Sequence, residues 1–327
     1  MSGSHAGDHA ADHAGDHAAD HAGDHAGDHA AAVAAAAGRA HPVSGRPRPR
    51  VGRIEFINCF PLYCHFEEEL RRFGYEADII EGTPARLNRL LVDGEIDIAL
   101  PSSIEFARHA DSLALLPGIS ISSFGAVDSI QLFTQIPREQ LGSVALTEKS
   151  ATSVCLLKIL CRHWGIAPSF AQRQGPLAQA LANFGGLLLI GDEALHIALD
   201  GVYPHQYDLG EEWRRMTGLP MVYAVCAARR DFVEERPDEA HAVEAALMAS
   251  RDRCAADPLE TAVAAAQLYD FSAAYLVEYF DKLKFGFTTE YRRGLDEFYR
   301  RAQDLGELDA PLDLGVALGL DRASGRP

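Results

Sequence analysis

The amino-acid sequence predicts an α/β protein with two lobes, preceded by a disordered N-terminal tail. Short apolar strands alternate with amphipathic helices in two successive series, and such alternation is typical of mostly parallel sheets covered by helices. Two further apolar segments, Ser129–Ile136 and Met221–Ala227, lie between the series and are expected to be strands that pass from one lobe to the other. Two lobes joined by two crossing strands form a clamshell, with a ligand cleft at the carboxyl ends of the strands.

The tail and linker are expected to occupy residues 1–50. Histidine recurs at every fourth position from His5 to His29, among Ala, Gly and Asp. This repeat has almost nothing to bury, so it is expected to be disordered. Histidines four residues apart could chelate a transition metal on one helix face, but incidental metal affinity of a solvated tail is the simpler interpretation. Arg46–Arg50 alternates Arg with Pro, which favours an extended linker.

Lobe one is expected to comprise residues 51–135 plus 225–320. Its first three strands are predicted at Arg53–Asn58, Glu76–Glu81 and Ile96–Leu100. Thr83 and Pro84 have the residue types of an N-cap and a first helical turn, so a helix should follow the second strand. Ser102 and Glu105 have the spacing of a capping box at the start of the next helix.

Lobe two is expected to comprise residues 136–224. Strands are predicted at Ser143–Thr147 and Leu187–Ile190. Between them, Ser150–Ser153 leads into a helix whose apolar stripe is formed by Val154, Leu157, Cys161 and Trp164. After Pro237 the pattern is helical only, and these helices are assigned to lobe one.

Composition excludes several classes of function. The chain has 327 residues and a formal charge of −17, almost all of it after residue 50. Such a body would repel nucleic acid and anionic membranes, and no apolar run has the roughly 20 residues of a membrane span. The six cysteines show neither zinc-ligand nor CxxC spacing. We therefore expect reduced thiols, no metal, no other cofactor and a cytoplasmic location; the oligomeric state is left open.

Polar residues at the strand-to-helix turns should face the cleft. The candidates are Asn58, Ser102, Ser103, Ser150, Ala151, Thr152, Ser153, Gly191 and Asp192, with Ser129 at the hinge. The helix start at 150–153 offers unpaired amides and hydroxyls, which would hold a carboxylate despite the net negative charge. Its Ser and Thr could equally cap the helix, and the capping interpretation is preferred for Ser102. Asp192 could act as a general base or as a cap.

Several motifs, taken in order, resemble the chorismate dehydratase family of the futalosine route to menaquinone. They are Phe56–Tyr63, Gly94–Ala99, Ser102–Ala107, Gly125–Ile130, Ser150–Val154, Leu189–Leu195, Asp208–Gly210 and Thr217–Pro220. The resemblance runs from about Pro49 to Gly319. It implies a fold like that of type II periplasmic binding proteins, used by an enzyme. Phe106 departs from the family, which often has Tyr there.

The resemblance implies loss of water from chorismate, giving 3-[(1-carboxyvinyl)oxy]benzoate. Asn58 and Ser129 are then the expected catalytic residues, closest to the reacting ring. Thr152 and Ser153, with the amides of their helix start, would hold one carboxylate, and Ser102 and Ser103 would help with the other. None of these is an evident base for the proton at ring carbon C3, so the enolpyruvyl carboxylate of the substrate is expected to take it.

Other functions remain as alternatives. The sister enzyme 1,4-dihydroxy-6-naphthoate synthase shares the clamshell, but it opens with a Ser-Pro-Cys-Pro-Asn-Asp-like turn that Asn58–Tyr63 does not match. A non-catalytic receptor for a small anion would need an export signal, which residues 1–50 do not resemble. A ligand-sensing regulator would need DNA-binding helices beside the lobes.

Overall fold

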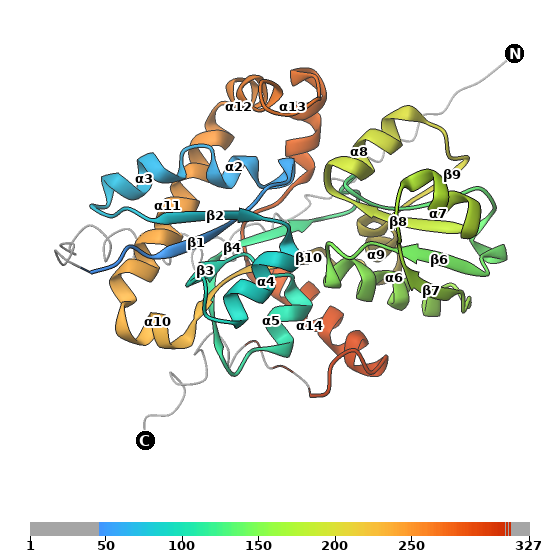
Figure 1. Cartoon of the computed structure of the whole chain (residues 1–327), viewed down its shortest axis with the longest axis horizontal. Coiled ribbons are helices and arrows are strands. Elements are labelled where there is room, and N and C mark those ends of the chain that lie inside the picture. Colours follow the sequence, from blue (N-terminus) through green and yellow to red (C-terminus); the bar gives the residue numbers. More distant parts are fainter. Residues whose placement is uncertain (1–45, 311, 313, 315–327) are drawn as a thin grey trace, which may run out of the picture.

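A computed structural model of the chain places two five-stranded sheets next to each other, each flanked by helices (Figure 1). The structure describes residues 46–310, 312 and 314. The expected disorder of the tail falls almost entirely on residues outside these ranges. The prediction of a two-lobed α/β fold is confirmed.

The first sheet has the strand order β2-β1-β3-β10-β4. Its strands are β1 (Arg50–Ile54), β2 (Asp78–Gly82), β3 (Ile98–Ala99), β4 (Leu113–Ser123) and β10 (Met221–Arg229). The strands β1, β2 and β3 are parallel, as βαβ connections require, while β10 runs antiparallel to both β3 and β4. The sequence pattern did not reveal β4, although it is the longest strand of this sheet.

The second sheet has the order β7-β6-β8-β5-β9. Its strands are β5 (Ile130–Thr134), β6 (Ser143–Leu146), β7 (Ser169–Gln172), β8 (Gly186–Ile190) and β9 (His205–Asp208). Both β5 and β8 are buried along their whole length, which explains their continuous apolar sequences. Here β5 is the strand that runs antiparallel to its neighbours.

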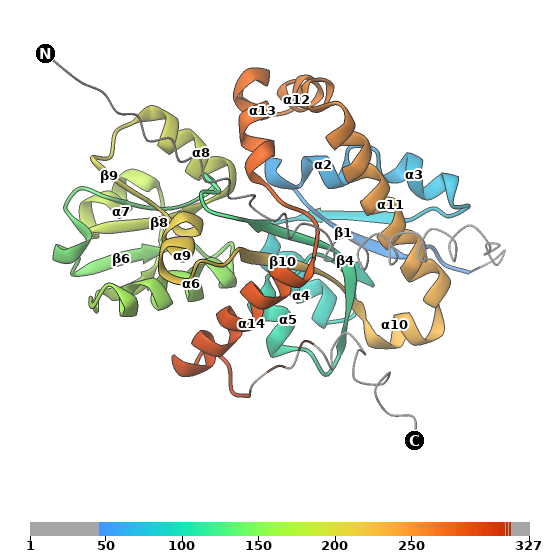
Figure 2. The same ribbon diagram turned by 180° about the vertical axis from the view of Figure 1, so that it is seen from behind.

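Helices cover both sheets (Figures 1 and 2). They are η1 (Ile57–Cys59), α2 (Phe60–Tyr63), α3 (Phe66–Arg72), α4 (Pro84–Val92), α5 (Ser103–Arg108), η2 (Arg138–Gln140), α6 (Ala151–His163), α7 (Leu177–Asn183), α8 (Gly191–Asp200), α9 (Leu209–Thr217), α10 (Arg230–Glu235), α11 (Pro237–Ala256), α12 (Pro258–Ala266), α13 (Ala273–Lys282) and α14 (Thr289–Asp304). Among the helices of the described residues, none is both long enough and apolar enough to cross a membrane.

The chain passes between the sheets twice, once in residues 124–129 and once in residues 209–220, which contain α9. The strands β5 and β10 follow these two passages directly. Because β5 forms all its pairs in the second sheet, the first passage ends before residue 130. The lobe boundary expected at residue 135 therefore lies too late in the chain by the length of this strand.

The helix α14 contacts both lobes, although its residues were assigned to lobe one. The Tyr299 hydroxyl donates to the Ser103 carbonyl at 2.7 Å, and Phe298 packs edge-on against Trp213 of α9. Just after α14, the Glu307 carboxylate accepts from Arg108 of α5 at 3.0 Å and from Lys158 of α6 at 2.6 Å. Figure 2 shows α14 below the junction of the two lobes. This helix therefore joins the lobes at a third place.

Candidate functional site

A small pocket lies between the two lobes, with a volume of about 50 Å³. Most of its wall is apolar, and the polar part comes from serines, one amide and one phenol. The lining residues are Ile54, Phe56, Asn58, Pro84, Leu100, Ser102, Ile121, Ser129, Ile130, Ser150, Ser153, Ile190, Gly191, Tyr223 and Ala224. This lining contains no Arg, Lys, Asp or Glu, so an anion placed here would be held by hydroxyls, amides and helix termini.

Six of the ten residues expected at the site line this pocket. They are Asn58, Ser102, Ser129, Ser150, Ser153 and Gly191. They come from five separate turns in the sequence and from both lobes. The other four, Ser103, Ala151, Thr152 and Asp192, are not part of the lining, and their positions correct the expectation that all ten side chains face the ligand.

Asn58 lies in η1 and not in the strand expected at 53–58. The strand β1 ends at Ile54, and the chain then bends so that the side chain of Asn58 reaches the pocket. Its Oδ1 atom is buried and has no hydrogen-bond partner among the described residues. A buried amide oxygen without a partner is destabilising unless a ligand or water satisfies it, so this atom is available to a bound molecule.

Asp192 supports the Asn58 turn and does not line the pocket. Its Oδ1 accepts a hydrogen bond from the Ile57 backbone N–H at 3.1 Å. Burial raises the pKa of this carboxyl above its usual range, and the hydrogen bond from Ile57 opposes that shift. The interaction joins α8 of lobe two to η1 of lobe one, so Asp192 helps to hold the lobes together at the pocket.

Ser129 and Gly191 meet at the hinge side of the pocket. The Gly191 N–H donates to the Ser129 carbonyl at 2.8 Å. Gly191 has φ = +64°, and a Cβ at this position would lie 3.1 Å from the ring of Phe56. Glycine is therefore required both for the backbone conformation and for the close approach of Phe56. The Ser129 hydroxyl donates to the Val127 carbonyl at 3.3 Å, a long bond that a ligand could replace.

The start of α6 provides both a cap and free amides. The Ser150 Oγ accepts from the Ser153 N–H at 3.2 Å and from the Ser153 hydroxyl at 3.0 Å. The capping interpretation is therefore right for Ser150, and the amide of Ser153 is already satisfied. The amides of Ala151 and Thr152, the first two helical residues, have no acceptor within the helix.

Thr152 and Ser103 bind each other across the lobes. The Thr152 Oγ1 accepts from the Ile104 N–H at 3.1 Å and lies 3.2 Å from the Ser103 Oγ. Ser103 also donates to the Val222 carbonyl at 2.9 Å. Both side chains are completely buried. These hydroxyls were expected to hold a carboxylate; in this arrangement both are engaged in joining α5 to α6.

The capping box expected at Ser102 and Glu105 is absent. No side-chain hydrogen bond caps α5 at Ser102, and the Glu105 carboxylate instead accepts from Arg108 at 2.6 Å. The Ser102 N–H donates to the Asn88 side chain at 3.2 Å. The prediction was wrong because these neighbours compete for both groups. The Ser102 hydroxyl is thus left to the pocket.

Comparisons with known proteins agree with this arrangement. Residues 49–304 match the model of a family described as menaquinone biosynthesis. The chain belongs to this family. A chorismate dehydratase from Thermus thermophilus is 40% identical over 200 residues, covering 56% of this chain and 71% of that protein. A second, from Campylobacter jejuni, is 31% identical over 176 residues, covering 53% of this chain and 64% of that protein.

Solved structures with the same fold include periplasmic binding proteins. The alkanesulfonate-binding protein of Xanthomonas axonopodis pv. citri, bound to MOPS, has a TM-score of 0.64 at 12% identity, covering 85% of this chain and 98% of that chain. The aliphatic sulphonate binding protein of Escherichia coli has a TM-score of 0.61 at 14% identity, covering 83% and 97%. At this identity the likeness concerns the fold alone, and it confirms a periplasmic-binding-protein-like clamshell.

Two polar residues at the site of this member of the menaquinone-biosynthesis family were not predicted from the sequence. Tyr223 lines the pocket, and its hydroxyl lies 2.9 Å from the Ser123 Oγ. Burial raises the pKa of Tyr223 well above its usual range, so it stays a neutral phenol. Lys149 Nζ lies 5.7 Å from the ring centroid of Phe56. The position of Lys149 in the turn before α6 was the available signal.

The hinge of this family member depends on Asp208. In the sequence this residue was noted only as part of the motif Asp208–Gly210, with no role predicted for it. One carboxylate oxygen accepts from the N–H groups of Val127 and Asp128 and from the Gln131 side chain, at 3.0, 2.6 and 2.9 Å. The other accepts from the first amides of α9 at 2.9 and 3.0 Å. Burial raises the pKa of Asp208 to about 6. Asp208 therefore ties together the two segments through which the chain passes between lobes.

Proposed function

We propose that this protein is a chorismate dehydratase, a hydro-lyase that forms 3-[(1-carboxyvinyl)oxy]benzoate. The observation that carries the proposal is the convergence of Asn58, Ser102, Ser129, Ser150 and Ser153 on one pocket between two lobes. Membership of the menaquinone-biosynthesis family and the two relatives named chorismate dehydratase support it.

The walls of the pocket suit the substrate. Chorismate has a cyclohexadiene ring, and Ile54, Leu100, Ile121 and Ile190 offer it an apolar surface. Removing the proton at C3 and the hydroxyl at C4 makes the ring aromatic, so the driving force lies in the substrate. The protein then needs mainly to orient chorismate and to exclude water.

The two carboxylates of chorismate need positive partners. The first amides of α6 point out of a 13-residue helix, whose N-terminus carries a partial positive charge. We assign one carboxylate to these amides at Ala151 and Thr152, together with the Ser153 hydroxyl, which would exchange its bond to Ser150 for one to the substrate. Lys149, just before the helix, adds a full positive charge near Phe56. The backbone amides and the lysine together would supply positive partners locally, although the protein as a whole carries a net charge of −17.

Asn58 and Ser129 are assigned to the reacting part of the ring. The Asn58 amide and the Ser129 hydroxyl would hydrogen-bond the C4 hydroxyl as it leaves. The enolpyruvyl carboxylate of chorismate takes the C3 proton, the electrons of the broken C–H bond complete the aromatic ring, and the C4–O bond breaks. The departing hydroxide and this proton together form the water that is lost.

The lobes have to separate before chorismate can enter. A volume of about 50 Å³ holds only a few water molecules, and chorismate is larger. A groove of about 460 Å³ adjoins the pocket at Ser150 and runs between α4, α5 and the start of α6. Opening about the passages at 124–129 and 209–220 would join this groove to the pocket, and closure would then expel water from the bound substrate.

The test is to incubate the purified protein with chorismate and to analyse the products by mass spectrometry. We expect a product lighter than chorismate by one water, with the ultraviolet spectrum of a substituted benzoate. Asn58→Ala serves as the matched inactive variant, because its side chain faces the pocket and makes no hydrogen bond to the described residues through Oδ1. If chorismate is unchanged while it binds tightly, the protein is a receptor and the proposal fails.

A further inference from the structure

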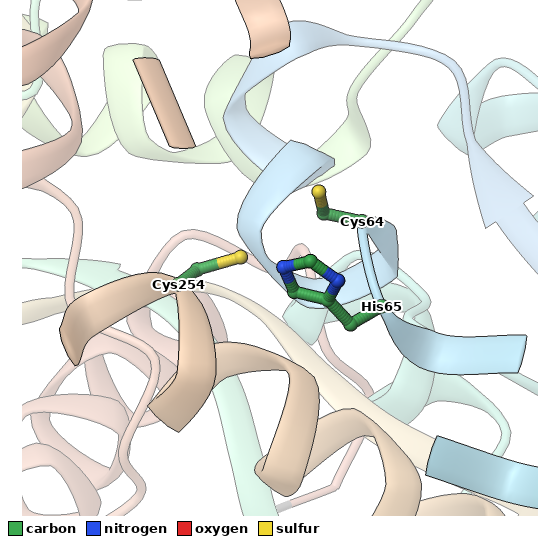
Figure 3. Close-up of side chains that lie close together, drawn as sticks. All are labelled: Cys64, His65 and Cys254. Atoms are coloured by element: carbon green, nitrogen blue, oxygen red, sulfur yellow. The ribbon is translucent and has the colours of Figure 1, made fainter. Parts of the chain in front are cut away.

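Three metal-ligating side chains gather on lobe one, outside the pocket between the lobes. Cys64 and His65 lie in the short connection between α2 and α3, and Cys254 lies in the last turn of α11. The two sulfurs and an imidazole nitrogen all lie within 4.8 Å of one another. Figure 3 shows the three side chains directed into the same space between the two chain segments.

We propose that Cys64, His65 and Cys254 bind one zinc ion, with a fourth coordination position open to water. Tetrahedral zinc has bonds of about 2.3 Å to sulfur and about 2.0–2.1 Å to nitrogen, so its ligand atoms lie roughly 3.5–3.8 Å apart. The observed separations, all within 4.8 Å, exceed this by no more than about 1.3 Å. Small rotations of the three side chains would therefore complete the coordination.

The backbone already fixes the two halves of the site. Ser250 precedes Cys254 by one helical turn and so lies on the same face of α11. Its hydroxyl accepts from the His65 N–H at 3.0 Å and donates to the Pro61 carbonyl at 3.2 Å. These two bonds set the position of the α2–α3 connection against α11. Little conformational entropy would be lost when a metal binds to ligands that are already held together.

The ligand types also suit this metal, since two cysteine sulfurs and one imidazole are groups that zinc commonly binds in proteins. Cys64 and His65 are half-buried and Cys254 is buried, so one side of the site is open to an entering ion.

Bound zinc would brace the segment that carries Asn58. From Asn58 the chain runs through η1 and α2 to Cys64 without a break, and the metal would fasten its end to the long helix α11. No spacing pattern points to such a site, because about 190 residues separate Cys254 from the other two ligands.

Cobalt(II) is the probe that separates this site from the histidine-rich tail. Thiolate bound to cobalt gives a charge-transfer absorption in the near ultraviolet, which histidine ligands do not produce. We would titrate the reduced, full-length protein with Co²⁺ and expect this band to saturate at one thiolate-bound ion per chain. Addition of Zn²⁺ should then abolish it. Zinc should also raise the Tm of the parent protein.

Variants decide the assignment. Cys64 is half-buried, so Cys64→Ala should fold normally. This variant should lose the charge-transfer band, and zinc should no longer raise its Tm. Cys254→Ala should lose the band as well. Cys161→Ala is the matched control, because Cys161 is buried in α6, where burial raises its pKa to about 12, and it should keep the band. Absence of the band in the parent, its persistence in Cys64→Ala, or formation of a Cys64–Cys254 disulfide in place of metal binding would each overturn the proposal.

Discussion

Replacing Thr152 with valine tests whether its hydroxyl joins the lobes or binds the substrate. Valine has the same shape but no hydroxyl, so the Ile104 N–H loses its acceptor at 3.1 Å. Ser103 keeps the Val222 carbonyl as its acceptor, so only one buried donor is left unsatisfied. Such a donor costs about 1–3 kcal/mol. We therefore expect Thr152→Val to lower the free energy of unfolding by that amount.

The assay combines urea denaturation with amide hydrogen exchange. In Thr152→Val the Ile104 amide should exchange faster than in the parent, whereas Thr152→Ser keeps the oxygen and should retain the protection. The KM for chorismate should change little in either variant, provided that the lobes still close. The reasoning is refuted if Thr152→Val unfolds within about 0.5 kcal/mol of the parent while its KM rises tenfold, since the hydroxyl would then face the substrate.

Three further outcomes are expected. Asn58→Ala and Ser129→Ala should each lower the kcat of chorismate dehydration by about 100-fold; near-parental turnover in both would remove the assigned roles. Gly191→Ala should lower the free energy of unfolding by about 1–2 kcal/mol, because φ is +64°, and an unchanged urea midpoint would contradict this. The pKa of Asp208 is raised by burial from 3.8 to about 6, so its contribution to stability is present below pH ~4 and is lost as the pH rises through 6. Between pH ~4 and pH ~6 the free energy of unfolding of the parent should fall by about 3 kcal/mol relative to that of Asp208→Asn. A rise in the parent's relative stability over this range would contradict the pKa shift.

Local sequence patterns predicted the parts of the fold that depend on local physics. Thr83 caps α4 through its side chain, and Ser150 caps α6, since both interactions need only residues three positions apart. The buried strands β8 and β10 were found because they are continuous apolar runs. The lobe boundary was placed too late because β5 is equally apolar, and nothing in its own sequence tells which sheet will pair with it.

The roles of the polar site residues depend on contacts between distant segments. Serine and threonine residues at a helix start look alike in the sequence. Yet Ser153 lines the pocket, whereas the Thr152 hydroxyl accepts a hydrogen bond from the N–H of Ile104, 48 residues earlier in the chain. The difference follows from helix geometry, because adjacent residues point about 100° apart around the axis. Which of the two faces the cleft is decided by where α5 packs on α6, and that packing is fixed by the whole of lobe one.

The same reasoning explains how an acidic protein can bind a dianion. Two carboxylates near the lobe junction are held by N–H donors: Asp192 accepts from the Ile57 amide, and Asp208 is surrounded by five N–H donors. These carboxylates use amides that would otherwise be free, and they fix the hinge and the Asn58 turn in place. The amides at the start of α6 have no such acceptor within the helix. That helix start therefore offers N–H donors although the net charge of the chain is −17, and a carboxylate of the substrate can complete the set of hydrogen bonds that the fold leaves open there.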